Sequence, residues 1–131
     1  MTPEQRRAIE TDCTRLINLY ANLNDQGRWQ EVAALYAEDG LMARPSAPDA
    51  PITGREAILA SFLARPARTS QHICANIVVD VESETAASAY SVILLFTSKD
   101  GPPLVGYYKD RFVLTGEGWR FSERRGGLTF A

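Results

Sequence analysis

Long apolar runs, a basic surplus and a dense cysteine pattern are all missing from this chain of 131 residues. No apolar stretch approaches the roughly 20 residues that a membrane-spanning helix requires, and the first residues, MTPEQRR, are too polar for a secretory signal. The formal net charge of −2 provides no electrostatic basis for binding nucleic acid or an anionic lipid surface. We therefore predict a cytoplasmic protein whose partners include neither nucleic acid nor a membrane.

Cysteine chemistry and cofactor motifs are equally sparse. Both cysteines, Cys13 and Cys74, fall inside periodic segments, which favours buried thiols in a reducing compartment over a disulfide. The sequence has no CxxC or Cys/His spacing typical of a metal site, and no P-loop, dinucleotide fingerprint or nucleophile elbow. We therefore predict neither a metal nor a cofactor.

Three amphipathic helices are predicted in the first half of the chain. Over residues 4–24, apolar positions recur at three- and four-residue spacing, and the buried stripe comprises Ile9, Cys13, Leu16, Ile17, Tyr20 and Leu23. A second helix is expected over residues 28–38. A third begins at the capping-box spacing of Thr53 and Glu56 and ends before Pro66.

The second half changes to period-two and β-branched patterns. These predict four strands, at residues 70–82, 86–98, 104–114 and 118–125. Links of hairpin length indicate a mostly antiparallel sheet, with a short strand near residues 41–44 at its edge and a proline-rich loop over residues 44–51. We predict a single α+β domain, residues 1–131, in which the helices cover a curved sheet and a cavity lies between them.

The predicted strand over residues 86–98 is apolar on both faces. Tyr90 and Val92 fall on one side, and Ile93 and Leu95 on the other. Three short helices can cover only one face of such a sheet, so the other face is expected to pack on a second subunit. We therefore predict a homo-oligomer, either a dimer or a trimer.

The only histidine, His72, lies at the start of the first long predicted strand. Strand parity places Cys74 and Asn76 beside it, so its face is the more polar one and is expected to line a wet pocket. An imidazole can transfer protons near neutral pH. The alternative is a hydrogen-bonded structural or surface histidine.

Asp25 ends the first predicted helix, where the helix dipole disfavours an anion and a compensating partner is expected. That partner is either His72, whose tautomer the carboxylate would fix, or Arg28, with Asp25 organising the turn. Tyr20 lies about one turn earlier on the buried stripe. Its hydroxyl either stabilises a substrate enolate or belongs to a core tyrosine bonded to the backbone.

Five further residues are weaker candidates for substrate contacts: Asn24, Arg44, Ser91, Tyr108 and Arg125. One of the two arginines near the end of the last strand, Arg124 and Arg125, can bind an anionic substrate group, and the alternative is a solvated or interface face. Trp29, Tyr36 and Phe62 are expected to be packing residues rather than ligand contacts.

Taken in order, the segments YANLNDQGRWQEVAALYAEDG, TGREAILASF, a histidine that opens a strand, and YYKDRFVLTGEGWRFSERR resemble the SnoaL-like branch of the nuclear transport factor 2-like superfamily. The resemblance covers nearly the whole chain. It implies a cone-like α+β roll of three N-terminal helices packed on a strongly curved, mostly antiparallel sheet that encloses a pocket. The superfamily also includes isomerases, polyketide cyclases, epoxide hydrolases and non-catalytic members, so the fold alone does not decide the activity.

Within that superfamily the chain looks most like scytalone dehydratase and bile-acid dehydratase, which abstract a proton next to a carbonyl and then eliminate water. Asp25 and His72 match their acid and histidine, and the spacing from Tyr20 to Asp25 resembles the bile-acid enzyme. Asn24, Arg44 and Ser91 depart from the scytalone dehydratase pattern. The resemblance implies a cofactor-independent lyase or isomerase for a small hydrophobic, cyclic or polycyclic carbonyl compound. The rival hypothesis is a non-catalytic ligand-binding protein or accessory subunit.

Overall fold

The computed structural model describes residues 1–130, which form three helices and six strands. The long first helix, α1 (Pro3–Asp25), begins with a capping box that sequence inspection missed: the Gln5 N–H donates to Thr2 Oγ1, and the Thr2 N–H donates to Gln5 Oε1. Its apolar stripe packs in the core, as the spacing predicts. The helix ends before Gly27, whose φ of +67° suits glycine.

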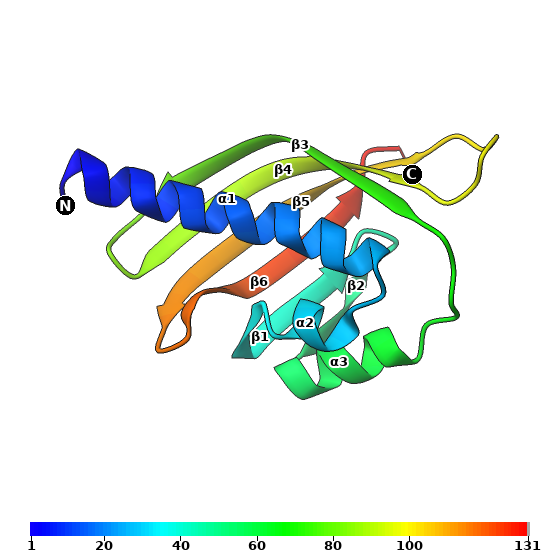
Figure 1. Ribbon diagram of the computed structural model, residues 1–131, viewed down its shortest axis with the longest axis horizontal. Coiled ribbons are helices and arrows are strands. Elements are labelled where there is room, and N and C mark those ends of the chain that lie inside the picture. Colours follow the sequence, from blue (N-terminus) through cyan, green and yellow to red (C-terminus); the bar gives the residue numbers. More distant parts are fainter. Residues whose placement is uncertain (131) are drawn as a thin grey trace.

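The strands form one curled sheet with two free edges: β1 (Tyr36–Arg44), β2 (Ala47–Thr53), β3 (Gln71–Val81), β4 (Ala86–Phe96), β5 (Leu104–Thr115) and β6 (Gly118–Leu128). Their order is β2-β1-β6-β5-β4-β3, and every neighbouring pair is antiparallel except β1 and β6. Figure 1 shows the sheet curving around α1, with the two short helices near β1 and β2. The predicted α+β roll with a mostly antiparallel sheet is confirmed.

The second helix is shorter than predicted. α2 (Trp29–Ala33) gives way to β1 at Tyr36 because β1 pairs with β6: the Phe121 N–H donates to the Leu35 carbonyl over 2.9 Å. Residues 36–38 therefore belong to the strand rather than the helix, because of a pairing that sequence periodicity cannot reveal. The edge strand predicted at residues 41–44 is correspondingly longer and lies inside the sheet, between β2 and β6.

The third helix, α3 (Arg55–Leu63), starts without the predicted capping box. Its N-cap is Gly54, which makes no side-chain cap bond, because Thr53 belongs to β2 and pairs with Leu41. A φ of +99° at Gly54 turns the chain from the strand into the helix. The capping-box prediction is therefore wrong, although the helix itself is present.

The proline-rich segment predicted as a loop is a hairpin. Arg44 pairs with Ala47, and β2 runs back along β1 as the edge strand of the sheet. An edge strand tolerates Pro48 and Pro51 because only one of its sides pairs with a neighbour. Pro45 and Ser46 at the hairpin turn line the cavity described below.

A bulge in β3 changes which side chains face the core. Its register with β4 shifts between Ala75 and Val78, and Asn76 adopts a φ of +52°. After Cys74, Ile77 is the next β3 residue that packs against the core, whereas Asn76 is exposed. The prediction that Asn76 shares the face of His72 is therefore wrong, because one extra residue reverses the alternation.

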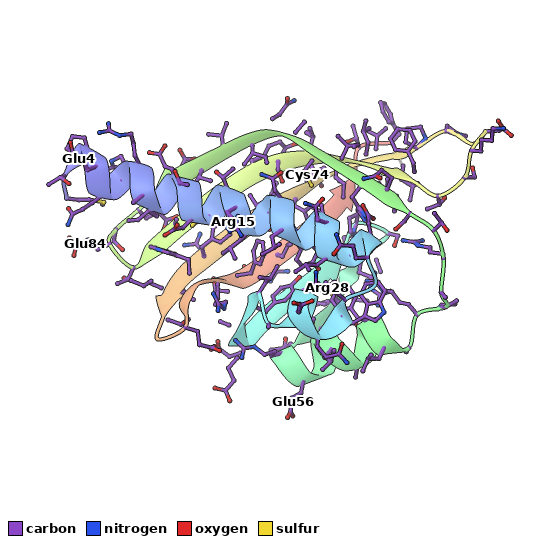
Figure 2. The ribbon with its side chains drawn as sticks, viewed as in Figure 1. Glu4, Arg15, Arg28, Glu56, Cys74 and Glu84 are labelled. Atoms are coloured by element: carbon purple, nitrogen blue, oxygen red, sulfur yellow. The ribbon has the colours of Figure 1, made fainter. Side chains whose placement is uncertain are left out.

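The opposite face of the sheet remains uncovered. Ile73, Val78 and Tyr90 are exposed there, and the ring of Tyr90 stacks on that of Tyr107 at a centroid distance of 5.9 Å. On the covered side, Cys74 lies where α1 meets the strands, while Glu4 and Glu84 lie at the periphery (Figure 2). Within residues 1–130, no helix is long and apolar enough to span a membrane.

Candidate active site

A cavity of about 340 Å³ lies between the end of α1, β1 and its hairpin turn, the segment after α3, and the ends of β3 to β6. Its polar lining includes Tyr20, Asn24, Arg44, His72 and Tyr108. The remaining wall near the strands is apolar. This volume lies at the lower end of the range typical of small-molecule sites, about 300–1,000 Å³.

Asp25 and His72 meet at the wall of this cavity. Asp25 Oδ1 lies 2.5 Å from His72 Nδ1, and the other carboxylate oxygen accepts the His72 backbone N–H over 2.7 Å. The side chains are only 12% and 10% exposed, respectively. With Nδ1 bonded to the carboxylate, Nε2 is the ring nitrogen left for a ligand in the cavity.

The sequence around His72 supplies the rest of the carboxylate's partners. Ser70 Oγ donates to Asp25 Oδ1 over 2.9 Å, and Gln71 Nε2 approaches Oδ2 at 3.4 Å. Three consecutive residues, Ser70 just before β3 and the first two residues of β3, thus bind the carboxylate at the C-terminus of α1, where the helix dipole alone would disfavour an anion. Of the two partners considered for Asp25, the structure has His72, while Arg28 pairs with Glu31.

Tyr20 lines the same cavity from one turn earlier on α1. Its hydroxyl lies 2.9 Å from the hydroxyl of Tyr36 and 3.6 Å from Met42 Sδ, so its partners are side chains rather than the backbone. When Tyr36 donates to Tyr20, the Tyr20 proton remains available for Met42 or for a ligand oxygen. Burial raises the pKa of Tyr20, so the phenol is a neutral donor near pH 7.

A second acid–base pair, Asp110 and Arg124, is buried behind the cavity wall. Arg124 Nε lies 3.1 Å from Asp110 Oδ1, and the guanidinium stacks 3.7 Å from the ring centroid of Tyr108 and 4.3 Å from that of Tyr20. Neither Asp110 nor Arg124 is among the residues that line the cavity. The two phenol rings lie on the guanidinium and also line the cavity.

Burial and pairing shift the pKa values of both groups of this buried pair. Burial raises the pKa of Asp110 to about 6, because desolvating the carboxylate outweighs its attraction to Arg124. For Arg124, burial alone would lower the pKa, but Asp110 and the surrounding phenols together raise it. At pH 7 the pair is therefore ionised.

The sequence-based candidates divide into two groups. Asn24, Arg44 and Tyr108 line the cavity together with Tyr20 and His72. Ser91 does not line it and is fully buried on β4. Trp29 packs against Phe62, with the rings stacked at 5.3 Å, in agreement with its expected packing role.

Arg125 also lies outside the cavity lining. Its side chain is 47% exposed and pairs with Glu123. The reason is a bulge at Ser122: Glu123 pairs with Arg111, but Phe121 pairs with Phe112. This extra residue turns Arg124 to the core and Arg125 outward, whereas unbroken alternation would place Arg125 on the face of the buried Phe121.

Two charged residues of the cavity lining, Arg65 and Arg68, are not among the candidates that the sequence suggested. Arg65 directly precedes Pro66, before which the third helix is predicted to end. Its guanidinium lies 4.4 Å from the ring centroid of Phe62, and both arginines border the cavity from the connection between α3 and β3. The only signal in the sequence was two arginines close together in a short link.

Among residues 1–130, no group of three or more His, Cys, Asp or Glu side chains could hold a metal ion. Cys13 and Cys74 are free thiols. Burial raises the pKa of Cys13 to about 12 and also raises that of Cys74, so both are protonated at neutral pH.

A curled sheet that holds a cavity against a long N-terminal helix is the architecture of the nuclear transport factor 2-like, cystatin-like fold. The chain belongs to the SnoaL-like domain family, whose sequence profile matches residues 5–125. No curated protein matches the sequence closely enough to count as a relative.

Solved structures agree with this assignment. A candidate scytalone dehydratase from Novosphingobium aromaticivorans is 27% identical, with 98% of this chain and 89% of that chain covered and a TM-score of 0.85. A nuclear transport factor 2-like protein with a cystatin-like fold from the same organism is also 27% identical, with 98% and 84% covered and a TM-score of 0.81. A type 2 hexachlorocyclohexane dehydrochlorinase is 14% identical, with 98% and 90% covered and a TM-score of 0.85, a likeness of fold alone.

Proposed function

We propose that this protein is a cofactor-independent lyase of the dehydratase type, or an isomerase, for a small cyclic hydrophobic carbonyl compound. The observation that carries the proposal is the pair of Asp25 and His72. A nearly buried carboxylate accepts from both the backbone N–H and Nδ1 of the single histidine, and the imidazole borders the cavity. The candidate scytalone dehydratase among the similar structures favours the same reaction class.

In the proposed reaction, His72 Nε2 removes a proton from the carbon next to the carbonyl. The electron pair of the broken C–H bond forms the C=C bond of an enolate while the carbonyl π pair moves to the oxygen, and Tyr20 donates a hydrogen bond to that oxygen. Asp25 keeps the proton on Nδ1 and balances the charge of the imidazolium. The carbonyl re-forms in either outcome. The proton on Nε2 is then delivered to a more distant carbon of a conjugated enolate, which is isomerisation, or to a hydroxide that the enolate electrons expel from the β-carbon, which gives water and a C=C bond and is dehydration.

Hydrogen exchange in a bound ketone tests this proposal. Bicyclic aromatic ketones such as 2-tetralone would first be screened for binding by changes in protein NMR spectra. Each binder would then be followed in D₂O, where we expect its acidic C–H signal to disappear faster with the protein than in buffer. Ketones that bind in the cavity without accelerated exchange would contradict the proposal and support the rival hypothesis of a non-catalytic ligand-binding protein or accessory subunit.

We further propose that the uncovered sheet face packs against a second copy of this chain, in a dimer or trimer. The exposed side chains of Ile73, Val78 and Tyr90 on this face support this, because apolar surface that gathers on one face is typical of interaction sites, and Val78 pairs directly with Tyr90. Light scattering after gel filtration at micromolar concentration should give a multiple of the chain mass, and Val78→Lys should shift it toward the monomer. A monomer for the unmodified protein would contradict the proposal.

A cytoplasmic location is a separate proposal. It is supported by the two free thiols, Cys13 and Cys74, because unpaired cysteines are typical of reducing compartments. Fractionation of the source cells should recover the protein with cytoplasmic markers, and recovery with an oxidising compartment would contradict it.

A further inference from the structure

Three arginines border the cavity from one side. Arg44 is the last residue of β1, whereas Arg65 and Arg68 lie in the connection between α3 and β3. Among the described residues that line the cavity, none is an aspartate or a glutamate. Asp25 is bonded to His72 and is also absent from the lining. The charge of this wall is therefore positive.

These arginines differ from most other arginines of the chain in their partners. Arg28, Arg55 and Arg124 each pair with a carboxylate. Within residues 1–130, neither Arg44 nor Arg65 makes such an ion pair. Arg44 Nη2 makes only a long bond, 3.4 Å, to the Ser61 carbonyl, and Arg65 lies over the ring of Phe62.

Part of each guanidinium is also withdrawn from water without a replacement bond. The Nε atoms of Arg44 and Arg65 are buried and have no hydrogen-bond partner within residues 1–130. A buried donor without a partner is unfavourable, and more so when the group is charged. Burial lowers the pKa of Arg65, and repulsion from Arg44 and Arg68 lowers it further. An anion at this wall would relieve both costs.

The opposite part of the cavity is apolar. Ile93, Leu95, Leu104 and Leu128 from the strand ends line it. A ligand that complements both parts of the cavity therefore has a hydrophobic ring at the strand ends and a negative charge at the arginines. Guanidinium groups bind carboxylates through two parallel hydrogen bonds, which makes a carboxylate a suitable match.

We infer that the substrate of this cavity is a cyclic carbonyl compound that carries a carboxylate, held by Arg44 and Arg65 with Arg68 at the cavity edge. The carbonyl part of this statement rests on the proposed function, whereas the carboxylate part rests on the arginines alone. The charged group lies at the arginine wall and orients the hydrophobic ring within the cavity. Such an anchor explains why positive side chains gather here without carboxylate partners of their own.

Two compounds of nearly equal shape, 2-naphthoate and 2-naphthamide, test the inference by isothermal titration calorimetry. The unmodified protein should bind the carboxylate at least about tenfold more tightly than the amide, since charge-assisted hydrogen bonds are the stronger ones and tenfold corresponds to about 1.4 kcal/mol. This preference should weaken as salt rises, because part of the cavity edge is open to solvent. Equal affinity for the two compounds would overturn the inference.

Arginine variants identify where the preference arises. Arg44→Gln and Arg65→Gln should each reduce naphthoate affinity by roughly tenfold and leave naphthamide affinity almost unchanged. Arg15→Gln is the matched control, because it removes the same charge from the exposed middle of α1 (Figure 2). A loss of preference in the control as large as in the cavity variants would contradict a local anchor.

A third variant, Arg68→Gln, tests the inference even if a cavity variant does not fold. Arg68→Gln changes an exposed residue, so it should fold even where a cavity variant does not, and it should reduce naphthoate affinity by a smaller factor. An unchanged carboxylate preference in all folded variants would overturn the inference. The proposed function fails on a different measurement, hydrogen exchange in bound neutral ketones, so either idea can fail without the other.

Discussion

Asp25 with His72 and Asp110 with Arg124 are two acid–base pairs on the concave side of the same sheet. The first pair lies at the wall of the cavity, where its side chains keep 12% and 10% of their exposure. The second lies behind two tyrosine rings, with exposures of 0% for Asp110 and 1% for Arg124. Both pairs join a carboxylate to a nitrogen base, but only one of them can reach a ligand.

The pairs also differ in how completely they are hydrogen-bonded. The Asp25 carboxylate accepts from Ser70 Oγ and from the backbone N–H and Nδ1 of His72, so several hydrogen bonds fix its orientation. The nitrogens of Arg124 and the oxygens of Asp110 are buried without well-aligned hydrogen bonds within residues 1–130, although the charges lie close together. A well-bonded pair beside a cavity suits proton transfer, whereas a pair held by charge and ring stacking suits a structural role.

The largest expected effect comes from breaking the first pair. His72→Gln should reduce ketone hydrogen exchange by about 10²–10⁴-fold, because the general base is lost. Asp25→Asn should also reduce it strongly, because the tautomer and charge balance of His72 are no longer maintained. Exchange rates by NMR measure both.

The control for Asp25→Asn is Asp12→Asn, the same change at an exposed position of α1. It should retain the exchange rate of the unmodified protein. Circular dichroism would establish that all variants fold. Full exchange activity in folded His72→Gln would show that the first pair is not catalytic.

Breaking the second pair should act on stability instead. Arg124→Met leaves the buried Asp110 carboxyl group without its cation at pH 7.5, and removal of one partner of a buried ion pair lowers the free energy of unfolding by about 3–5 kcal/mol. Arg125→Met is the matched control, since its exposed pair with Glu123 is worth at most about 1 kcal/mol. Urea unfolding measures both, and equal losses for the two variants would contradict the assignment.

The second pair should also show a pH dependence of stability. The pKa of Asp110 is about 6 in the folded protein and about 3.9 in an unfolded chain, so the folded state binds the proton more tightly. The contribution of Asp110 to the free energy of unfolding is therefore complete below about pH 4, and it is lost as the pH rises through 6. The difference in unfolding free energy between the unmodified protein and Asp110→Asn should change with that sign, and a change of opposite sign would contradict it.

The smallest effect is expected at Ser91, a sequence-based candidate that lies outside the cavity lining. Its Oγ is buried without a hydrogen-bond partner within residues 1–130, so Ser91→Ala should change the unfolding free energy by less than about 1 kcal/mol and leave hydrogen exchange intact. Ser88→Ala on the same strand is the control. A large loss of exchange in Ser91→Ala alone would place Ser91 in the site after all.

The positions of the first pair and of Tyr20 within their own helix and strand could be predicted from local sequence pattern. Helical spacing put Tyr20 on the buried face of α1 and Asp25 at its end, and the strand pattern put His72 at the start of β3. The distance between the two ends could not be read from local pattern, because residues 47 positions apart meet only when α1 packs across β3. From the sequence, the contact between Asp25 and His72 is therefore only a hypothesis, and the structure places Asp25 Oδ1 2.5 Å from His72 Nδ1.

The predictions for three elements, α2, β3 and β6, were wrong for related reasons. The chain leaves α2 early to pair β1 with β6, and bulges at Asn76 and Ser122 reverse the alternation in β3 and β6. Each depends on a partner strand distant in sequence, and a single extra residue is enough to exchange the two faces. This is why Arg124 rather than Arg125 turned inward.

By itself, the sequence determined the fold class, the buried stripe of α1, most of the strands and the chemical identity of Tyr20, Asp25 and His72, because periodicity and residue type are local properties. The tertiary structure alone decided which polar groups share a cavity. It brought Arg44, Arg65 and Arg68 to one wall, and it buried Asp110 with Arg124 behind two tyrosines. Those outcomes depend on strand register and on the packing of a hairpin against a distant connection, and neither is encoded in any short stretch of the chain.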